Sequence, residues 1–259
     1  MFKILKMATG LAIILTLLTG LSPLHADLED KSLVLYLSFD EGSGNTTKDQ
    51  SSYGHDAELT ANPSWVDGQF GSKALEFDGT KGQYAMVPIN DTLQLREQFS
   101  VAFWVKRGDT QIREWNYMVS AGSLVWAVIF NNNTKKTYMF TKGPGWAQKG
   151  ISDEEQPEDW VHLSVVHDID NDVSFYYDGK KVGGGAKPPA IIEIDGSIMV
   201  GARHPGQEFF TGVIDEVYLF NRAISTDEID IIRAGDFTPV QPAEKLTTTW
   251  GAIKTNRKH

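Results

Sequence analysis

The chain has 259 residues, enough for one large domain or two small ones, and its 34 acidic residues outnumber its 24 basic ones to give a net charge of −10. Its lysines and arginines cluster only between Lys254 and Lys258, so a nucleic-acid partner, which needs a basic surface, is not expected. The absence of cysteine excludes a disulfide framework, a lipid-attached cysteine and a thiol nucleophile.

Residues 1–26 have the pattern of a secretory signal peptide. Two lysines precede an apolar run from Met7 to Leu21, and Ala26 supplies the small residue of a cleavage site. We therefore expect export, cleavage after Ala26 and a secreted, extracellular or periplasmic protein that is not inserted in the membrane. The alternative is an uncleaved anchor, although the apolar run is short for a spanning helix.

Short strands separated by turn residues account for most of the chain from residue 31 to 220. Apolar or alternating runs bounded by Gly, Asn, Asp or Pro predict strands within 31–39, 55–78, 84–88, 99–105, 115–120, 124–130, 137–141, 160–167, 173–177, 198–201 and 209–220. The segment 142–159 has no period and is expected to be irregular. Strands at this spacing predict an all-β, two-sheet antiparallel sandwich.

One short helix is expected after the last strand. Ser225 and Glu228 have the spacing of a capping box, isoleucines at 229, 231 and 232 give the helix an apolar side, and Gly235 ends it. We expect this helix to cover a sheet edge. Residues 27–236 are assigned to one domain, and 237–259 to a linker and tail.

The run from Gly212 to Phe220 is the stretch around which the other strands are expected to assemble. It is apolar on both sides except at Asp215 and Glu216, which predicts a central strand covered on both faces. A buried carboxylate costs free energy unless it is hydrogen-bonded, paired or bound to a cation. Both carboxylates therefore need partners.

This run, together with the segment Phe220–Ser225, resembles the closing strand of the laminin-G-like, concanavalin A-like jelly-roll domains of secreted bacterial proteins. Further segments follow in the order of that family: Leu37–Gly44, Ala74–Gly79, Phe99–Val105, and Trp160–Val166 with Phe175–Lys180. The resemblance extends over residues 32–235. It implies a jelly-roll fold, and it bears more on the fold than on the function.

The resemblance also implies a structural Ca²⁺ where the first and last strands meet. The candidate ligands are Asp40, Glu41, Asp49, Asp78, Asp215 and Glu216. Calcium takes six to eight oxygen ligands, and acidic pairs beside a glycine-rich turn suit it chemically. The alternative is that Asp40 and Asp78 cap turns, while Asp215 pairs with Arg222 or accepts backbone amides.

A carbohydrate site needs an exposed aromatic ring with polar groups at its edge. The candidates are Trp146, Trp115, Tyr138, Arg203 and His204. Trp146 leads because it lies in a Gly-Pro-Gly loop where no period buries it. Trp104, Trp126 and Trp160 are expected in the core, and His162 is expected to be a packing residue.

The sequence favours a non-catalytic module that binds a glycan or a glycosylated surface. Concanavalin A-like glucanases carry Glu-x-Asp-x-x-Glu on one strand. The runs that begin at Glu193 and Glu228 both lack the last Glu. The alternatives are a protein-adhesion module, and a polysaccharide hydrolase or lyase of the same superfamily.

Overall fold

The computed structural model describes residues 30–142, 146–188, 191–203 and 206–236, except the side chains of residues 146–149. Its strands and helices are β1 (Leu33–Leu37), β2 (Thr46–Thr47), β3 (Ala57–Thr60), β4 (Ser64–Asp67), η1 (Gln69–Gly71), β5 (Lys73–Phe77), η2 (Gly79–Lys81), β6 (Tyr84–Pro88), η3 (Asp91–Leu93), β7 (Gln98–Arg107), β8 (Trp115–Ala121), β9 (Trp126–Asn131), β10 (Lys136–Lys142), β11 (Trp146–Ser152), β12 (Val161–Asp168), β13 (Val173–Tyr177), β14 (Lys180–Gly185), β15 (Ser197–Val200), β16 (Gly212–Phe220) and α1 (Thr226–Ala234). The expected signal peptide and tail lie outside the described residues. Within the described ranges, no helix is long and apolar enough to cross a membrane.

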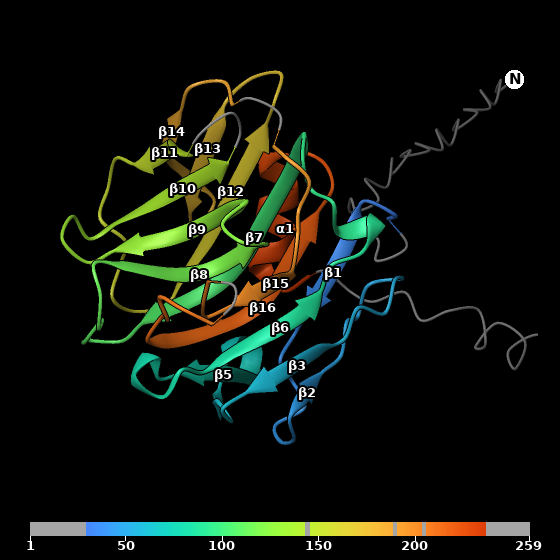
Figure 1. Cartoon of the computed structure of the whole chain (residues 1–259), viewed down its shortest axis with the longest axis vertical. Helices are drawn as coiled ribbons and strands as arrows, with labels where there is room; N and C mark the ends of the chain where they lie inside the picture. The colour runs from blue at the N-terminus through green and yellow to red at the C-terminus, as the bar shows by residue number, and fades with distance from the viewer. Residues whose placement is uncertain (1–29, 143–145, 189–190, 204–205, 237–259) are drawn as a thin grey trace, which may run out of the picture.

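The strands form one hydrogen-bonded path that folds into two facing layers (Figure 1). The front layer has the order β2-β3-β6-β15-β8-β9-β10-β11, and the back layer has the order β14-β13-β12-β7-β16-β5-β4, with β1 paired to β16. The layers join where β11 pairs with β14. This confirms the predicted all-β, two-sheet antiparallel jelly-roll sandwich.

The hydrophobic core fills the space between the two layers. Strand β7 lies between β12 and β16 and sends Phe99 and Phe103 into this space. There Phe99 meets Trp126 of β9, with ring centroids 5.0 Å apart, so the two layers are in direct contact. Burial of a large apolar side chain stabilises the fold by roughly 1.5–3 kcal/mol. The expectation of a buried inner strand at 99–105 is confirmed.

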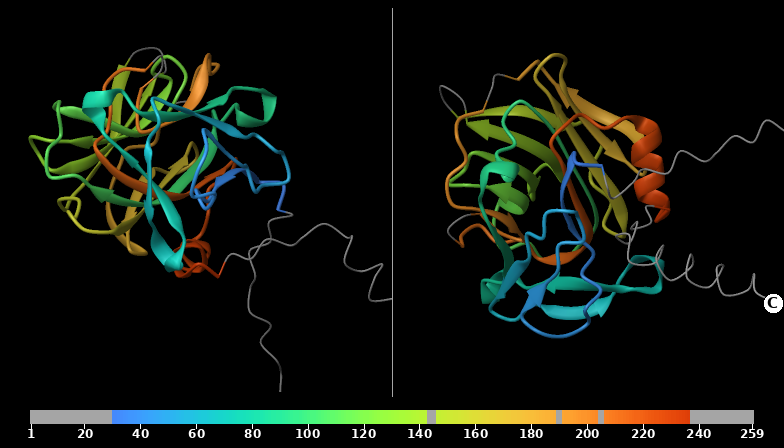
Figure 2. Two further views of the ribbon diagram at one scale, coloured as in Figure 1. Left: turned by 90° about the horizontal axis from the view of Figure 1, so that it is seen from below. Right: turned by 90° about the vertical axis from the view of Figure 1, so that its right-hand side faces the viewer.

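Helix α1 packs on the outer face of the back layer (Figure 2). The capping box is formed: Ser225 Oγ accepts from the Glu228 amide at 3.3 Å, and the Glu228 carboxylate accepts from the Ser225 amide at 2.8 Å. Ile229 and Ile232 are buried in one cluster with Tyr218 of the central strand β16. The expectation that this helix covers a sheet edge is therefore wrong, because the outer face of the central strands is itself apolar and needs cover.

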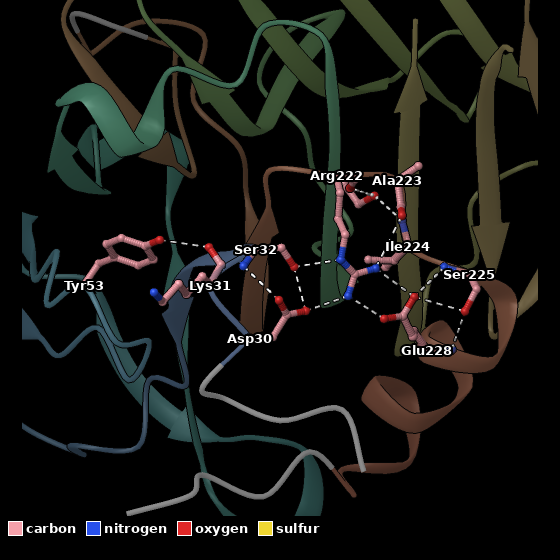
Figure 3. Close-up of polar contacts among 10 residues, drawn as sticks. Asp30, Lys31, Ser32, Tyr53, Arg222, Ala223, Ile224, Ser225 and Glu228 are labelled. Carbon is pink, nitrogen blue, oxygen red and sulfur yellow. Dashed lines mark hydrogen bonds and ion pairs between the residues drawn. The ribbon is translucent and has the colours of Figure 1, made fainter. Parts of the chain in front are cut away.

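Arg222 ties the start of the described chain to the helix (Figure 3). Its Nη2 lies 2.7 Å from Asp30 Oδ2, its Nε donates to Ser32 Oγ at 2.7 Å, and its Nη1 donates to Glu228 Oε2 at 2.9 Å. Charged partners on both sides hold the guanidinium in place. Because Arg222 binds Asp30, Ser32 and Glu228, it does not pair with Asp215. The ion pair between Asp215 and Arg222 that the sequence allowed is therefore not formed.

Strands β11 and β14 have no counterpart among the predicted strands, and β11 crosses the segment expected to be irregular. Gly150 of β11 is buried, and a side chain there would come within 2.6 Å of the Phe175 ring. At Gly183 of β14, a side chain would meet the Ile151 carbonyl oxygen at 2.5 Å. Rings and backbone from neighbouring strands fill these positions, so neither strand shows the apolar alternation that predicts one.

Candidate functional site

An aromatic surface lies on the outer face of the front layer. In the register of β8, β9 and β10, Tyr117 pairs with Ile129 and Ile129 pairs with Tyr138, so the three side chains form one row. The Trp115 ring lies 5.2 Å from the Tyr138 ring and 5.3 Å from the Phe140 ring, edge to face in both cases. Because side chains alternate between the faces of a strand, the same strands contribute their other residues to the core.

These side chains border a cavity of about 410 Å³, which we call the aromatic groove. Its lining is Trp115, Tyr117, Leu124, Ile129, Phe140, Arg203 and Glu208. The volume falls near the lower end of the ~300–1,000 Å³ range of small-molecule sites. Trp115 and Phe140 are half-buried, whereas Tyr138 is buried beneath them. The groove is therefore apolar on its floor and open to solvent.

An ion pair forms the polar edge of the aromatic groove. Arg203 Nε lies 2.8 Å from Glu208 Oε2, and the guanidinium sits 5.9 Å from the centre of the Tyr117 ring. Burial raises the pKa of the Tyr117 phenol above its usual range, and the nearby charge of Glu208 adds to this effect. The phenol thus stays protonated, and its hydrogen bond to Glu208 contributes to the rise. Donors and acceptors beside an apolar floor are the groups that a sugar needs.

The structure brings together three of the five residues predicted for a glycan site: Trp115, Tyr138 and Arg203. His204 and the side chain of Trp146 lie outside the described residues. Tyr117, Phe140 and Glu208 were missed. The alternation of Tyr138 with Phe140 along one strand was the signal that could have revealed the second aromatic residue.

The other tryptophans divide between core and surface. Trp126 is fully buried, as expected. Trp104 and Trp160 are half-buried, so the expectation that they lie in the core is wrong. Trp104 lies on the outer face of β7, where Phe70 and His162 pack edge-on against its ring. His162 is buried and packs as predicted, and burial lowers its pKa to about 3.

Asp215 is a fully buried carboxylate. Its Oδ2 accepts from the Gln69 amide at 2.8 Å, and its Oδ1 accepts from the Glu216 amide at 3.0 Å. Burial raises the pKa of Asp215 to about 8, with the charges of Glu216 and Asp40 adding to the rise. In the described part of the chain, no ion pair joins it to a lysine or arginine. Its negative charge is therefore unfavourable without a cation.

Glu216 lies at a bulge, where Asp215 pairs with Trp104 but the next paired residue is Tyr218. Its φ of 53° is in the left-handed region, which is uncommon for a residue with a side chain. Glu216 Oε2 accepts from Tyr36 Oη at 2.6 Å and from Tyr218 Oη at 2.9 Å, and the two tyrosine rings stack on each other. This side chain is already satisfied by two hydroxyl groups.

The remaining predicted metal ligands have separate roles in turns. Glu41 accepts from the Lys48 amide at 2.7 Å, Asp49 accepts from the amides of Tyr36, Ser51 and His55, and Asp78 caps the η2 turn through the Thr80 amide at 2.9 Å. Asp40 is exposed and accepts only a long bond of 3.2 Å from the Lys73 amide. Among the described residues, no group of three or more acidic or histidine side chains could hold a metal ion.

Gly68 packs directly against the Asp215 carboxylate. A Cβ atom at position 68 would lie 2.5 Å from Asp215 Oδ2 and 2.7 Å from the Lys73 carbonyl oxygen, so a residue with a side chain would clash there. Asp40 is close enough to raise the pKa of Asp215. Of the six predicted calcium ligands, Glu41, Asp49, Asp78 and Glu216 are engaged by other groups, and Asp40 and Asp215 lie near each other.

Neither near-match to the glucanase motif contributes a residue to the lining of the aromatic groove. Glu228 is bound to Arg222 and Ser225 in the capping box. Glu193 is exposed, and Asp195, two residues later, accepts from the Ser123 amide at 2.8 Å. The acidic residues of both runs lie outside the strands.

A two-layer antiparallel sandwich with this strand order is a concanavalin A-like jelly roll. The model of the concanavalin A-like lectin/glucanases superfamily, Laminin_G_3, matches residues 78–230, and the chain belongs to this family. The resemblance drawn from the five sequence segments is thereby confirmed.

Solved structures share the fold at low identity. One is domain 4 of AbnA, a GH43 extracellular arabinanase from Geobacillus stearothermophilus, which was solved in complex with arabinotriose. It has a TM-score of 0.62 and 20% identity, and the match covers 78% of this chain and 98% of the AbnA domain. The binding domain of Paraclostridial Mosquitocidal Protein 1 has a TM-score of 0.64 and 18% identity over 82% of this chain and 54% of that one. The binding domain of Botulinum Neurotoxin DC in complex with SialylT has a TM-score of 0.61 and 14% identity. That match covers 79% of this chain and 51% of the neurotoxin chain.

A curated relative also matches. The Adhesion G-protein coupled receptor V1 of Danio rerio is 26% identical over 176 residues, which cover 61% of this chain. The match spans only 3% of the length of that receptor. It therefore concerns one small part of a much larger protein.

Proposed function

We propose that this protein is a secreted, non-catalytic module that binds carbohydrate in the aromatic groove. The observation that carries the proposal is the groove itself, where Trp115 and Phe140 stand half-exposed beside the Arg203–Glu208 pair. Sugars present apolar C–H faces that pack on aromatic rings, and hydroxyl groups that need donors and acceptors at the ring edge. The Tyr117 phenol and the ion pair supply those polar groups.

Two of the solved structures named above support a glycan as the ligand. The arabinanase domain was solved with arabinotriose and the neurotoxin domain with SialylT. The binding domain of the same neurotoxin was also solved with rat synaptotagmin II, and the match covers 52% of that chain, so a protein is the alternative class of ligand. An aromatic groove with an ion pair at its edge favours a sugar here, whereas a protein partner would favour a broad apolar patch.

Calcium and export are further parts of the proposal. Asp40 and Asp215, with the Lys73 carbonyl, would hold a structural Ca²⁺, and backbone carbonyls or water would complete its six to eight oxygens. The ion would neutralise the buried Asp215 carboxylate. The pattern of residues 1–26 supports export, and mass spectrometry of the exported chain would show Asp27 as its first residue.

The test is binding to a panel of soluble polysaccharides and immobilised glycans. Trp115→Ala should weaken binding at least tenfold, because the largest exposed ring of the groove is lost. Trp65→Ala is the matched control, since Trp65 is also half-buried but lies on β4 in the back layer. Equal binding by wild type and Trp115→Ala would defeat the proposed site.

A reducing-sugar assay over the same panel addresses the catalytic alternative. We expect no release of reducing ends. Release that a single carboxylate substitution abolishes would show that the chain is a hydrolase. Binding to a protein partner with no glycan bound would favour the adhesion alternative.

A further inference from the structure

A second cavity lies directly beside the aromatic groove. It has a volume of about 460 Å³, and its lining includes Thr80, Ile112, Arg113, Gln207 and Phe209. Arg203 and Glu208 line both cavities. The ion pair is therefore a shared wall and not the outer limit of the site.

The contacts of Arg203 show how the two cavities meet. On the side of the aromatic groove, its guanidinium lies over the Tyr117 ring. On the side of the second cavity, its Nη2 donates to Gln207 Oε1 at 2.6 Å. The backbone reinforces this arrangement, because Arg203 pairs with Gln207 and the Tyr117 amide donates to the Glu208 carbonyl at 3.3 Å. The wall is fixed from both sides.

The second cavity also combines apolar and polar groups, and it is the more polar of the two. Phe209 is half-buried, and its ring lies 6.3 Å from the Tyr84 ring and nearly parallel to it. Ile112 is 40% exposed, which is unusual for a large apolar side chain. Thr80, Arg113 and Gln207 add polar groups. Each cavity thus offers an apolar platform with hydrogen-bonding groups beside it, and both share one ion pair.

We propose that the ligand is an internal stretch of a linear polysaccharide chain, which occupies the aromatic groove and the second cavity together and crosses the Arg203–Glu208 pair. The inference rests on the proposed glycan-binding function. A repeating ligand presents the same groups at regular intervals and can use two similar cavities at once. A terminal monosaccharide would fill only one of them. Each cavity alone is near the lower end of the usual ~300–1,000 Å³ range, so neither is large enough for a long segment.

The test is calorimetric titration of the exported chain with defined oligosaccharides of whichever polysaccharide binds in the panel, from the dimer to the octamer. Affinity should rise with chain length and then level off once both cavities are filled. Phe209→Ala should weaken binding of the long oligomers about tenfold, which corresponds to ~1.4 kcal/mol. Phe209→Ala should leave the affinity for the disaccharide unchanged, whereas Trp115→Ala should weaken binding of both the disaccharide and the long oligomers.

Phe209 also contacts the position of Gly82, so its loss could disturb the fold. Ile112→Ser is the second variant, because Ile112 is more exposed and lines the same cavity. Its melting temperature should match wild type, and its affinity for long oligomers should fall. Equal affinity for dimer and octamer, or long-oligomer binding unaffected by both variants, would overturn the inference. Neither result would remove the groove as a glycan site, whereas failure of every glycan to bind would defeat the proposed function itself.

Discussion

Tyr36 and Glu216 are 180 positions apart in the chain, and a hydrogen bond of 2.6 Å joins the phenol of the first strand to the carboxylate of the last. Glu216 is only 6% exposed, so few other donors can reach it. Burial raises its pKa, while the hydrogen bonds from Tyr36 and Tyr218 act in the opposite direction. The bond therefore both closes the sandwich and keeps a buried carboxylate satisfied.

Tyr36→Phe should destabilise the protein by about 1–3 kcal/mol, because the buried carboxylate loses one of its two hydroxyl donors. Urea unfolding measures this change. Tyr53→Phe is the control, since it also removes a phenol, but one that bonds the Lys31 carbonyl at an exposed position. A Tyr36→Phe loss no greater than that of the control would mean that Glu216 is satisfied without Tyr36.

The sequence allows the strands with strong apolar patterns and the capping box to be predicted. β7 and β16 are apolar on both sides because the core lies on one face and α1 with its neighbours on the other. The capping box is a local motif that needs no tertiary information. β11 and β14 could not be found in this way, because Gly150 and Gly183 make room for groups that only the folded chain brings near.

The site was predictable in part. Trp115 and Tyr138 belong to strands whose pattern is visible in the sequence. Glu208 was not predictable, because its pairing with Arg203 depends on a turn in which Glu208 has a positive φ of 51°. The six acidic candidates for calcium lie near turns or in one strand. The sequence does not show that the carboxylates of Asp49 and Asp78 accept hydrogen bonds from nearby backbone amides.

Calcium should raise the melting temperature of the exported chain relative to EDTA. A ligand at a hundredfold excess over its Kd stabilises the native state by roughly 2.7 kcal/mol, which corresponds to a rise of several degrees. Asp215→Asn should abolish the rise. In EDTA this variant should melt lower than wild type, because an amide nitrogen replaces one of the two carboxylate oxygens that accept from the Gln69 and Glu216 amides.

Asp78→Asn is the control for the calcium experiment. Asp78 was one of the predicted ligands, but it caps the η2 turn, so this variant should keep the full calcium-dependent rise. No rise in wild type would defeat the calcium proposal. A full rise in Asp215→Asn would place the ion elsewhere.

His162 should make the protein less stable as pH falls below about 6.5. Burial lowers its pKa to about 3, with the positive charge of Arg233 as a smaller cause, against 6.5 for an unperturbed histidine. Between these values the unfolded chain binds a proton that the folded chain does not. The free energy of unfolding therefore loses nothing to His162 above pH 6.5. Between pH 6.5 and pH 3 it falls as the pH falls, with a slope approaching ~1.4 kcal/mol per pH unit.

His162→Phe removes this titration and keeps an aromatic ring against Trp104. Carboxylates also titrate at low pH, so the useful quantity is the difference in unfolding free energy between variant and wild type, measured by urea unfolding at pH 7 and pH 4.5. That difference should shift in favour of the variant at the lower pH. An identical difference at both pH values would show that His162 does not titrate as its burial implies.

Glu208→Gln should change which glycans bind. The side chains of Arg203 and Glu208 are 19% and 31% exposed, so their pairing is largely shielded from solvent. Removing the carboxylate charge leaves a cation between the two cavities. Binding of neutral oligosaccharides should weaken several-fold, because Arg203 loses the partner that orients it, whereas oligosaccharides that contain uronic acid should lose less affinity or gain it.

The measurement is the ratio of the affinity for uronic-acid oligosaccharides to the affinity for neutral ones, obtained by titration at low and high salt. A loss of folding lowers both affinities equally, so a changed ratio reports the charge effect. A ratio equal to that of wild type would mean that Arg203 does not face the bound glycan.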